Sequence, residues 1–458
     1  EPSFTSAGEH LLMNPTGGAI ALMTTVRAVY SSSNERLTRN VLEVVYNPDQ
    51  PGEYPGIAEI MRRSKNEGLD SIDVNARKFT LLGDPSMKLA IPRYDVVVTH
   101  INGNVVGGGV LDTLSALEKS SLTGLIVDDN GQVLSDFNGK IFLTVYDKVQ
   151  ARKTLANDED SSERFFNVQN KQLFKGAATV IAGQWFIEFV LPKDIDFSYG
   201  SGKLSFYAQN GITDAAGYFT SFNIGGVSSG GLADDEPPVI QLYMNDDNFV
   251  SGGITDQDPD IYIVLSDDFG INVSGTGVGH DLEAVLDGDD KNSLILNDFY
   301  QAALDDYTRG EVRYPLNNIA PGKHTLKVTA WDLANNPGEA YIEFLVLDQE
   351  GGVLEHVLNY PNPFTNSTNF QFEHNRPGVE MDLQVLIYTI NGRLVKTIER
   401  EGYSSDGYRI DDLPWDGLDD SGGQLAKGVY VYKIKVAYHL NGGKDIVESK
   451  AEKLVILR

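Results

Sequence analysis

Two side chains able to bind a peptide follow a short apolar run near the start of the sequence. Gly17–Thr24 has the length and composition of a buried strand, and Thr25 and Arg27 come directly after it. Ligands of open α/β sheets lie beyond the carboxyl ends of the strands. Thr25 and Arg27 are therefore predicted to line a peptide-binding cleft. The alternative, that Arg27 pairs with a structural carboxylate, stays open.

Three acidic groups, Asp256–Asp260, Asp267–Asp268 and Asp287–Asp290, form a second candidate set. Oxygen-rich loops of this kind bind calcium. The EF-hand spacing fails at Asp287, because its sixth position is not glycine and its twelfth is Asp298 rather than glutamate. Solvated turns are the favoured interpretation. No metal site and no cofactor is assigned, with structural calcium as the alternative.

Composition removes several kinds of chemistry. The sequence has no cysteine, which excludes disulfides, thiolate zinc sites and a cysteine nucleophile within these residues. With 37 basic and 65 acidic residues the net charge is −28, which repels phosphate backbones, so no nucleic-acid partner is expected. No stretch approaches the length of a membrane span. A secreted chain is expected to begin with Met and a signal peptide, and this one begins at Glu1 without either, so we interpret it as mature, truncated or part of a longer protein.

The first ninety residues mix helical and strand patterns. Helices are predicted to begin at the Ser6-x-x-Glu9 capping box, at Ser33 or Asn34, and at Pro55, and strands are predicted at Gly17–Thr24, Phe79–Leu82 and Met87–Ile91. This order is typical of a parallel α/β sheet. Such a sheet needs several neighbouring strands, because an unpaired buried strand leaves backbone polar groups without partners. We therefore predict that the segment closes a larger domain whose remainder lies upstream.

From about Tyr94 the apolar residues alternate with a period of two, which predicts β structure. The predicted strands are Asp95–Ile101, Leu122–Val127, Lys140–Tyr146, Gln184–Val190, Lys203–Ala208, Pro237–Tyr243, Pro321–Asp332 and Ala340–Val346. The polar stretch Gln150–Gln172 is predicted to be a long mobile insertion. Gly225–Glu236 is predicted to be a linker, and a short joint is predicted at Asp348–Gly352.

The last hundred residues have the most ordered pattern, with strands and turns in regular alternation. Their pieces are Tyr360–Phe364, Asp382–Tyr388, Gly392–Val395, Gly428–Lys435 and Lys453–Arg458. This order resembles the C-terminal sorting domain of the type IX secretion system, which implies export across an outer membrane. The last apolar strand, comprising Lys453, Leu454, Val455, Ile456, Leu457 and Arg458, is predicted to be an exposed edge that pairs with a partner. Ordinary closure of the sandwich is the alternative.

The N-terminal piece resembles the end of the gingipain family of cysteine endopeptidases. The residues that carry this resemblance are Asn14–Arg27, the helix bearing Arg36, and Phe79–Leu89. Asp112–Leu117 and Gly124–Asp128 further resemble the type IX sortase of that family. The implied fold is a partial caspase- or gingipain-like α/β segment followed by three mainly antiparallel β-sandwich domains. The expected boundaries are 1–93, 94–233, 234–348 and 349–458.

The resemblance also implies an activity and partners. In this family a thiolate and an imidazole form the catalytic dyad, and the family order places both before Gly17. No residue of this chain is therefore assigned a catalytic role, and His10 is interpreted as a helix-face histidine. A sortase of this kind removes the sorting domain of secreted cargo and attaches the cargo to anionic lipopolysaccharide. Expected partners are a PorV-like outer-membrane β-barrel shuttle protein and the missing N-terminal half, with the protein held at the cell surface.

Two other functions stay open. A non-catalytic surface adhesin would have a front domain that merely descends from a protease. A secreted gingipain-like protease would act on outside proteins and lose its sorting domain on maturation.

Overall fold

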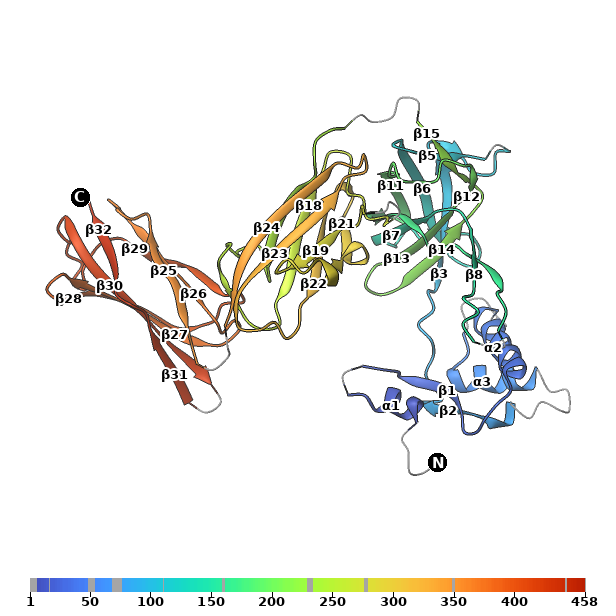
Figure 1. Ribbon diagram of the computed structural model, residues 1–458, viewed down its shortest axis with the longest axis horizontal. Helices are drawn as coiled ribbons and strands as arrows, with labels where there is room; N and C mark the ends of the chain where they lie inside the picture. The colour runs from blue at the N-terminus through green and yellow to red at the C-terminus, as the bar shows by residue number, and fades with distance from the viewer. Residues whose placement is uncertain are drawn as a thin grey trace.

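The chain forms a series of β-rich parts with one small helical part at its start. The computed structural model describes residues 6–15, 17–47, 54–67, 76–109, 111–158, 161–228, 234–275, 279–347, 351–440 and 443–457. Four separate hydrophobic clusters follow one another along the chain. We call the regions around them the first (6–91), second (94–228), third (234–347) and fourth (351–457) parts. Figure 1 shows the fourth part and the first two parts toward opposite ends of the long axis.

The first part contains three α-helices and a two-stranded sheet. Its elements are α1 (Ala7–Met13), β1 (Ala21–Thr25), α2 (Ser31–Tyr46), α3 (Ile57–Asn66), the 3-10 helix η1 (Ala76–Lys78) and β2 (Phe79–Gly83). The predicted capping box is present, since Ser6 and Glu9 bond each other's backbone N–H. A small core of Val44, Val45 and Ile60 joins α2 to α3.

Two predictions for this part are wrong. β1 and β2 run antiparallel, with Thr25 opposite Phe79, where the sequence predicted a parallel sheet. The reason is that two packed helices, not one, connect the strands, so the chain re-enters the sheet at the end from which it left. Met87–Ile91 is not a strand, and only Lys88 forms an isolated bridge, to Gly56. None of the helices within the described ranges is long and apolar enough to cross a membrane.

The second part is built on a sheet that closes on itself. Its strands are β3 (Tyr94–Ile101), β4 (Asn104–Val105), β5 (Thr113–Ala116), β6 (Lys119–Val127), β7 (Gly139–Tyr146), β8 (Gln150–Lys153), β9 (Phe165–Val168), β10 (Gln172–Ile181), β11 (Gln184–Val190), β12 (Gly200–Ser201), β13 (Lys203–Gln209), β14 (Asp214–Phe219) and β15 (Asn223–Val227). The order β14-β13-β7-β10-β11-β6-β3-β4 is closed by a pairing of β14 with β3, and β12, β15 and β5 form a smaller sheet. The expected sandwich is thus a ring in its main sheet.

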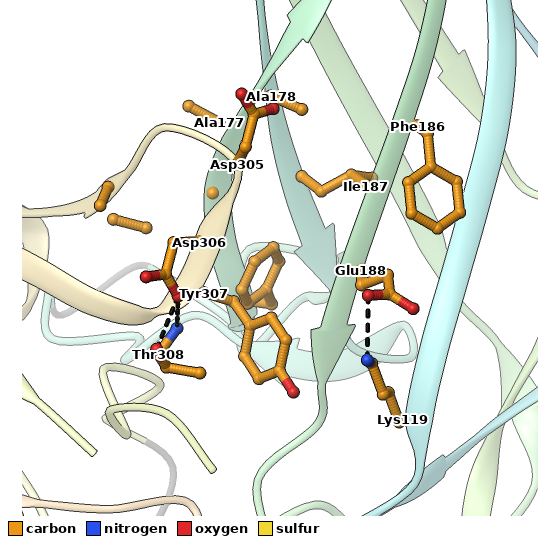
Figure 2. A pocket seen from close by; sticks show the side chains of 14 residues that line it. Lys119, Ala177, Ala178, Phe186, Ile187, Glu188, Asp305, Asp306, Tyr307 and Thr308 are labelled. Carbon is orange, nitrogen blue, oxygen red and sulfur yellow. Dashed lines mark hydrogen bonds and ion pairs between the residues drawn. The ribbon is translucent and has the colours of Figure 1, made fainter. Parts of the chain in front are cut away.

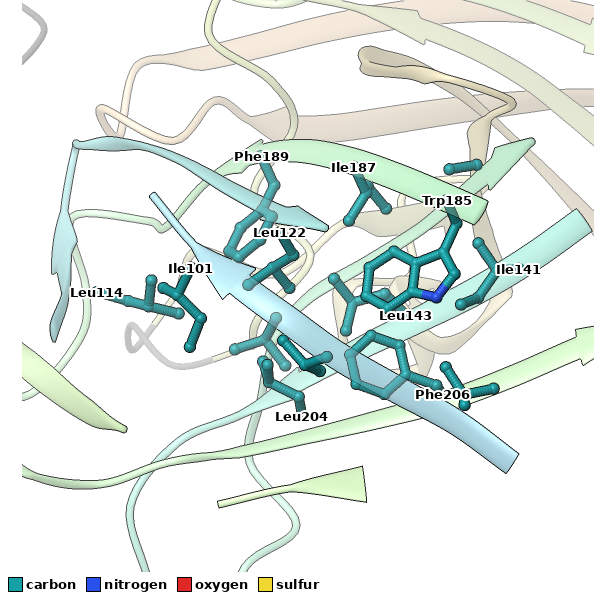
Figure 3. Close-up of a cluster of buried hydrophobic side chains, with 14 of the residues drawn as sticks. Ile101, Leu114, Leu122, Ile141, Leu143, Trp185, Ile187, Phe189, Leu204 and Phe206 are labelled. Carbon is teal, nitrogen blue, oxygen red and sulfur yellow. The ribbon is translucent and has the colours of Figure 1, made fainter. Parts of the chain in front are cut away.

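Inward-facing side chains of the ring form its core. Figure 3 shows Trp185, Phe206, Ile141 and Leu143 packed within it, and the Trp185 and Phe206 rings lie 5.1 Å apart. The close contact between β6 and β3 requires glycine at position 124, because a Cβ there would lie 2.1 Å from the Val97 carbonyl oxygen. This packing explains why the alternating pattern found in the sequence corresponds to strands.

One connecting segment differs from its prediction, and two others lie partly outside the described residues. Gln150–Gln172 contains a β-hairpin, since β8 pairs with β9 from Gln150↔Val168 to Lys153↔Phe165. The predicted linker Gly225–Glu236 begins inside β15, and residues 229–233 lie outside the described ranges. The predicted joint at Asp348–Gly352 also falls largely outside them, at residues 348–350.

The third part contains two sheets that share one core. Its elements are β16 (Val239–Met244), β17 (Ile254–Thr255), β18 (Asp260–Ser266), β19 (Glu283–Leu286), η2 (Asp290–Asn292), β20 (Leu294–Ile295), η3 (Asn297–Phe299), β21 (Tyr300–Ala303), β22 (Asp306–Pro315), β23 (Gly322–Trp331) and β24 (Pro337–Val346). The strand orders are β16-β18-β22-β21 and β17-β24-β23-β19-β20. Residues of both sheets, including Ile263 and Val328, enter the same cluster.

The fourth part also pairs two sheets around one core. Its strands are β25 (Leu354–Tyr360), β26 (Thr368–His374), β27 (Met381–Thr389), β28 (Leu394–Tyr403), β29 (Arg409–Trp415), β30 (Gly428–Leu440), β31 (Gly443–Glu448) and β32 (Glu452–Ile456). β25, β26 and β29 form one sheet, and β28, β27, β30, β31 and β32 form the other. Along β30 every second side chain from Tyr430 to Tyr438 is buried, which is the alternation seen in the sequence.

The core of the second part predicts a large difference between two otherwise identical substitutions. Ile141 is 1% exposed and Ile212 is 91% exposed. Ile141→Ala should lower the free energy of unfolding by about 2–5 kcal/mol through lost burial and a cavity, and Ile212→Ala by less than about 0.5 kcal/mol. The chain's three tryptophans lie in different parts, so urea unfolding followed by Trp185 fluorescence in a Trp331→Phe, Trp415→Phe background reports on this part alone. Equal effects would contradict the ring core.

Candidate functional site

The predicted cleft residues lie where β1 ends. Thr25 is half-buried and Arg27 is exposed. The turn between them is held by η1, because Val26 N donates to the Lys78 carbonyl oxygen at 2.9 Å and Lys78 Nζ donates to the Ala28 carbonyl oxygen at 2.7 Å. In the part of the chain that the structure describes, no carboxylate pairs with Arg27. The alternative of a structural ion pair therefore has no support among these residues.

An apolar hollow of 160 Å³ lies beside this strand end, between α2, α3 and the sheet. It is lined by Met23, Leu37, Thr38, Val41, Met61, Ser64 and Phe79. Its lining holds no titratable group, and the Ser64 hydroxyl already donates to the Ile60 carbonyl oxygen at 2.7 Å. The hollow is therefore suited to binding an apolar side chain rather than to chemistry. Sequence analysis did not predict this hollow, because its lining residues come from four separate elements.

The sheet of the first part has unpaired strand edges. β1 and β2 pair with each other over five residue pairs, and neither has a second strand neighbour among the described residues. No residue of α1 is buried, and Leu11, Met13, Ile20 and Leu42 are exposed. Free strand edges next to exposed apolar side chains are surfaces that pair with further polypeptide. His10 is exposed on α1, as expected for a helix-face histidine.

The terminal strand β32 is held on both sides. One edge pairs with β30, from Gly428↔Ile456 to Tyr432↔Glu452. The other edge meets the segment before β26, where Phe364 N donates to the Val455 carbonyl oxygen at 3.0 Å and Leu457 N donates to the Phe364 carbonyl oxygen at 2.9 Å. Leu454 and Ile456 are fully buried. Arg458 lies outside the described residues.

The Asn362 side chain adds two hydrogen bonds to this second edge of β32. Asn362 donates from Nδ2 to the Lys453 carbonyl oxygen at 2.8 Å and accepts from Val455 N at 3.0 Å. A strand whose outer backbone groups are already bonded offers a poor template for a partner. The geometry thus favours closure of the fold for Lys453–Leu457 over the predicted partner edge.

The acidic groups separate into two kinds. Asp256 accepts a hydrogen bond from the Tyr408 hydroxyl at 2.7 Å, and Asp287 pairs with His324 at 2.7 Å. Asp289 caps η2. Those carboxylates bond side chains or backbone of the chain itself, and Asp256 does so across the junction with the fourth part. Asp267 instead lies in a cluster with Asp234 and Asp332, and one carboxylate oxygen from each is within 4.8 Å of the others.

The cluster by itself assigns no metal. Both oxygens of fully buried Asp332 already accept hydrogen bonds from Asn336, at 2.6 and 2.7 Å. Calcium takes six to eight oxygen ligands, and three carboxylates meet here among the described residues. Burial, with Asp234 and Asp267 nearby, raises the pKa of Asp332 to about 6. Sequence analysis did not predict this cluster, because Asp234, Asp267 and Asp332 are far apart in the chain.

The matched leucines Leu454 and Leu457 test the role of the terminal strand. Leu454 is fully buried and Leu457 is 47% exposed. Leu454→Ala should cost about 2–5 kcal/mol of unfolding free energy, and Leu457→Ala less than about 1 kcal/mol. Unfolding is followed by Trp415 fluorescence in a Trp185→Phe, Trp331→Phe background. A loss below 1 kcal/mol for Leu454→Ala would show that β32 is not part of the closed fold.

The raised pKa of the Asp332 carboxyl predicts that the third part becomes less stable as pH rises. Its folded pKa of about 6 lies above the ordinary value of 3.8, so the folded state binds the proton more tightly between these values. Its contribution to stability is therefore lost as pH rises from about 4 through about 6. In Asp332→Asn this fall should disappear, and Asp268→Asn, which changes an exposed neighbour, should retain it. The measurement is the unfolding midpoint against pH, followed by Trp331 fluorescence; an unchanged slope in Asp332→Asn would contradict it.

Comparison with known proteins places the first part in a family. Residues 1–90 match the family model of peptidase family C25. This match confirms the resemblance to gingipains stated from the sequence. Among curated proteins, none matches the chain.

Solved structures give further likenesses. Dimeric latent PorU from Porphyromonas gingivalis is 30% identical over 90% of this chain, with a TM-score of 0.38. The chain spans 39% of that PorU chain. A tandem-repeat region of a large adhesion protein is 13% identical, covering 75% of this chain and 73% of that one at a TM-score of 0.18. A bacterial ice-binding adhesin is 11% identical, covering 80% and 99% at a TM-score of 0.16.

Proposed function

Because residues 1–90 belong to peptidase family C25, the gingipain family, we propose that this chain is the C-terminal portion of a type IX secretion system sortase. The observation that carries the proposal is the 30% identity to PorU along 90% of the chain. The first part is then the closing piece of a caspase- or gingipain-like α/β domain. The three parts after it are β domains with boundaries near 94–233, 234–348 and 349–458. The first of them is built on a ring-shaped main sheet, and the last is a retained sorting domain.

The open first part supports a role in a larger catalytic domain. Upstream strands pair with the free edges of β1 and β2 and cover the apolar hollow at Met23 and Phe79. Upstream sequence also supplies the cysteine and histidine, since this chain has no cysteine and is inactive alone. Arg27, exposed at the end of β1, then lies on the side of the sheet where open α/β sheets bind ligands, together with Thr25.

The proposed reaction has two stages. The upstream thiolate attacks the carbonyl carbon before the sorting domain of arriving cargo, and the sorting domain leaves with the amine while a thioester forms. An amine on anionic lipopolysaccharide then attacks the thioester, and the cargo becomes attached to the surface. With water in place of the amine the outcome is proteolysis. A PorV-like outer-membrane β-barrel holds the enzyme at the extracellular face, and neither metal nor cofactor takes part.

The test compares this chain with the longer protein that includes its upstream sequence. The substrate is a reporter protein fused to a type IX sorting domain. The longer protein should release the sorting domain, iodoacetamide should block the release by alkylating the nucleophile, and the 458-residue chain should leave the reporter intact. In the longer protein Arg27→Ala should lower kcat/KM by about tenfold, the effect of losing one charged hydrogen bond.

Arg36→Ala is the matched control, because Arg36 is likewise exposed but lies on α2. Backbone hydrogen exchange at 21–25 and 79–83 should be slower in the longer protein, where upstream strands cover the edges. Absence of cleavage would contradict the sortase and favour a surface adhesin. Cleavage that resists alkylation would contradict a cysteine nucleophile. Loss of residues after about Asp348 from the surface-bound protein, read by intact mass, would favour a secreted protease instead.

A further inference from the structure

A cavity of 350 Å³ lies between the second and third parts. Figure 2 shows Phe186, Ile187 and Glu188 of β11 on one side and Asp305–Thr308 on the other. Its remaining lining includes Lys119, Phe174 and the small residues Gly176, Ala177 and Ala178 of β10. The volume falls within the range of ligand-binding sites, about 300–1,000 Å³.

The cavity opens where two neighbouring strands separate. β10 and β11 pair only at Val180↔Trp185 and Ile181↔Gln184, although each continues for several residues. β10 continues instead along β7, with which it pairs from Phe174 to Val180. The Phe174 ring then packs against Phe189, with ring centroids 4.8 Å apart, and crosses beneath Gly176, where a Cβ would lie 2.4 Å from the ring. A side chain thus holds the strands apart.

The separation leaves backbone groups of β11 without partners. Residues of an antiparallel strand direct their N–H and C=O alternately to its two sides. Gln184 closes the hairpin toward β10, so the backbone groups of Phe186 and Glu188 also face β10. The pairing of β10 with β11 ends at Trp185, before these two residues. Within the described residues, no backbone hydrogen bond reaches this edge of β11 at Phe186 or Glu188. Phe186 and Glu188 therefore present a short free strand edge to the cavity.

The opposite edge, that of β10, already bonds the turn of a hairpin. The hairpin between β21 and β22 reaches β10, where Leu304 forms a parallel bridge with Ala177. Asp305 N donates to the Ala177 carbonyl oxygen at 3.0 Å, and Thr179 N donates to Asp305 Oδ1 at 2.7 Å. The facing edge of β11 has the same backbone chemistry without such an occupant.

The charges around the cavity select for a cation. Glu188, Asp305 and Asp306 line it, with Lys119 as the one cation of the lining. Lys119 pairs with Glu188 at 2.9 Å, and Arg309, next to the lining, approaches Asp306 at 3.9 Å. The floor of Phe174 and Ile187 is apolar and the rim is acidic. Backbone of an added strand fits the free edge, and a lysine or arginine side chain complements the rim.

We propose that this cavity binds an extended segment of another protein that carries a lysine or arginine and adds as a strand to Phe186–Glu188 of β11. Main-chain hydrogen bonds supply the affinity in this mode of recognition, and the acidic rim supplies the preference. The site lies outside the family segment 1–90, so it does not rest on the sortase proposal.

The test uses the full chain and a short acetylated peptide of alternating threonine and valine with a central lysine. Binding is measured by fluorescence anisotropy, and amide exchange of the chain is measured with and without peptide. Binding should slow exchange at Phe186 and Glu188 by about tenfold or more. Methylating alternate backbone nitrogens of the peptide, or replacing its lysine by glutamate, should weaken binding by about tenfold.

Matched variants separate the site from general electrostatics. Glu188→Gln, Asp306→Asn should bind the lysine peptide about tenfold more weakly, with an unchanged unfolding midpoint. The control is Glu339→Gln, since Glu339 makes a similar exposed pair with Lys327 at 2.6 Å in the third part. Binding that survives N-methylation, exchange at Phe186 and Glu188 that does not slow at saturating peptide, or no binding at all would each overturn the proposal.

Discussion

The need of every strand edge for a hydrogen-bonding partner is the constraint on which this structure depends. The second part meets it by closing its main sheet through β14 and β3, except where β10 and β11 separate. The fourth part meets it at β32 with Phe364 and Asn362. The first part does not meet it within the described residues, where β1 and β2 pair only with each other. Edge chemistry thus distinguishes the parts that are closed from the part that needs more polypeptide.

Carboxylates also form hydrogen bonds and ion pairs across the junctions between neighbouring parts. Asp194 of the second part bonds His280 of the third at 2.6 Å, and Glu373 of the fourth part accepts from Ile254 N of the third at 3.0 Å. Tyr408 reaches Asp256 across the same junction. A chain of net charge −28 therefore uses part of its acidic excess to join neighbouring parts, where a single carboxylate accepts several donors.

Sequence reasoning worked best where local rules decide the outcome. The Ser6–Glu9 capping box, the start of α3 after Pro55 and the strands with period-two alternation are all present. It failed where distant segments decide. Met87–Ile91 has strand composition but meets only Gly56, and Gln150–Gln172 reads as a polar insertion although β8 and β9 pair within it. Pairing depends on what lies alongside, which composition does not state.

The candidate sites likewise divide into features that local sequence determines and features that distant segments determine. The sequence alone determined the family of residues 1–90, the absence of a cysteine nucleophile in this chain and the position of Arg27 after a strand. Only the tertiary structure decided that β32 is closed on both edges, that Asp234, Asp267 and Asp332 share one cluster, and that β10 and β11 separate around Phe174. Local order is encoded in neighbouring residues, whereas edges, clusters and cavities arise from contacts between residues far apart in the chain.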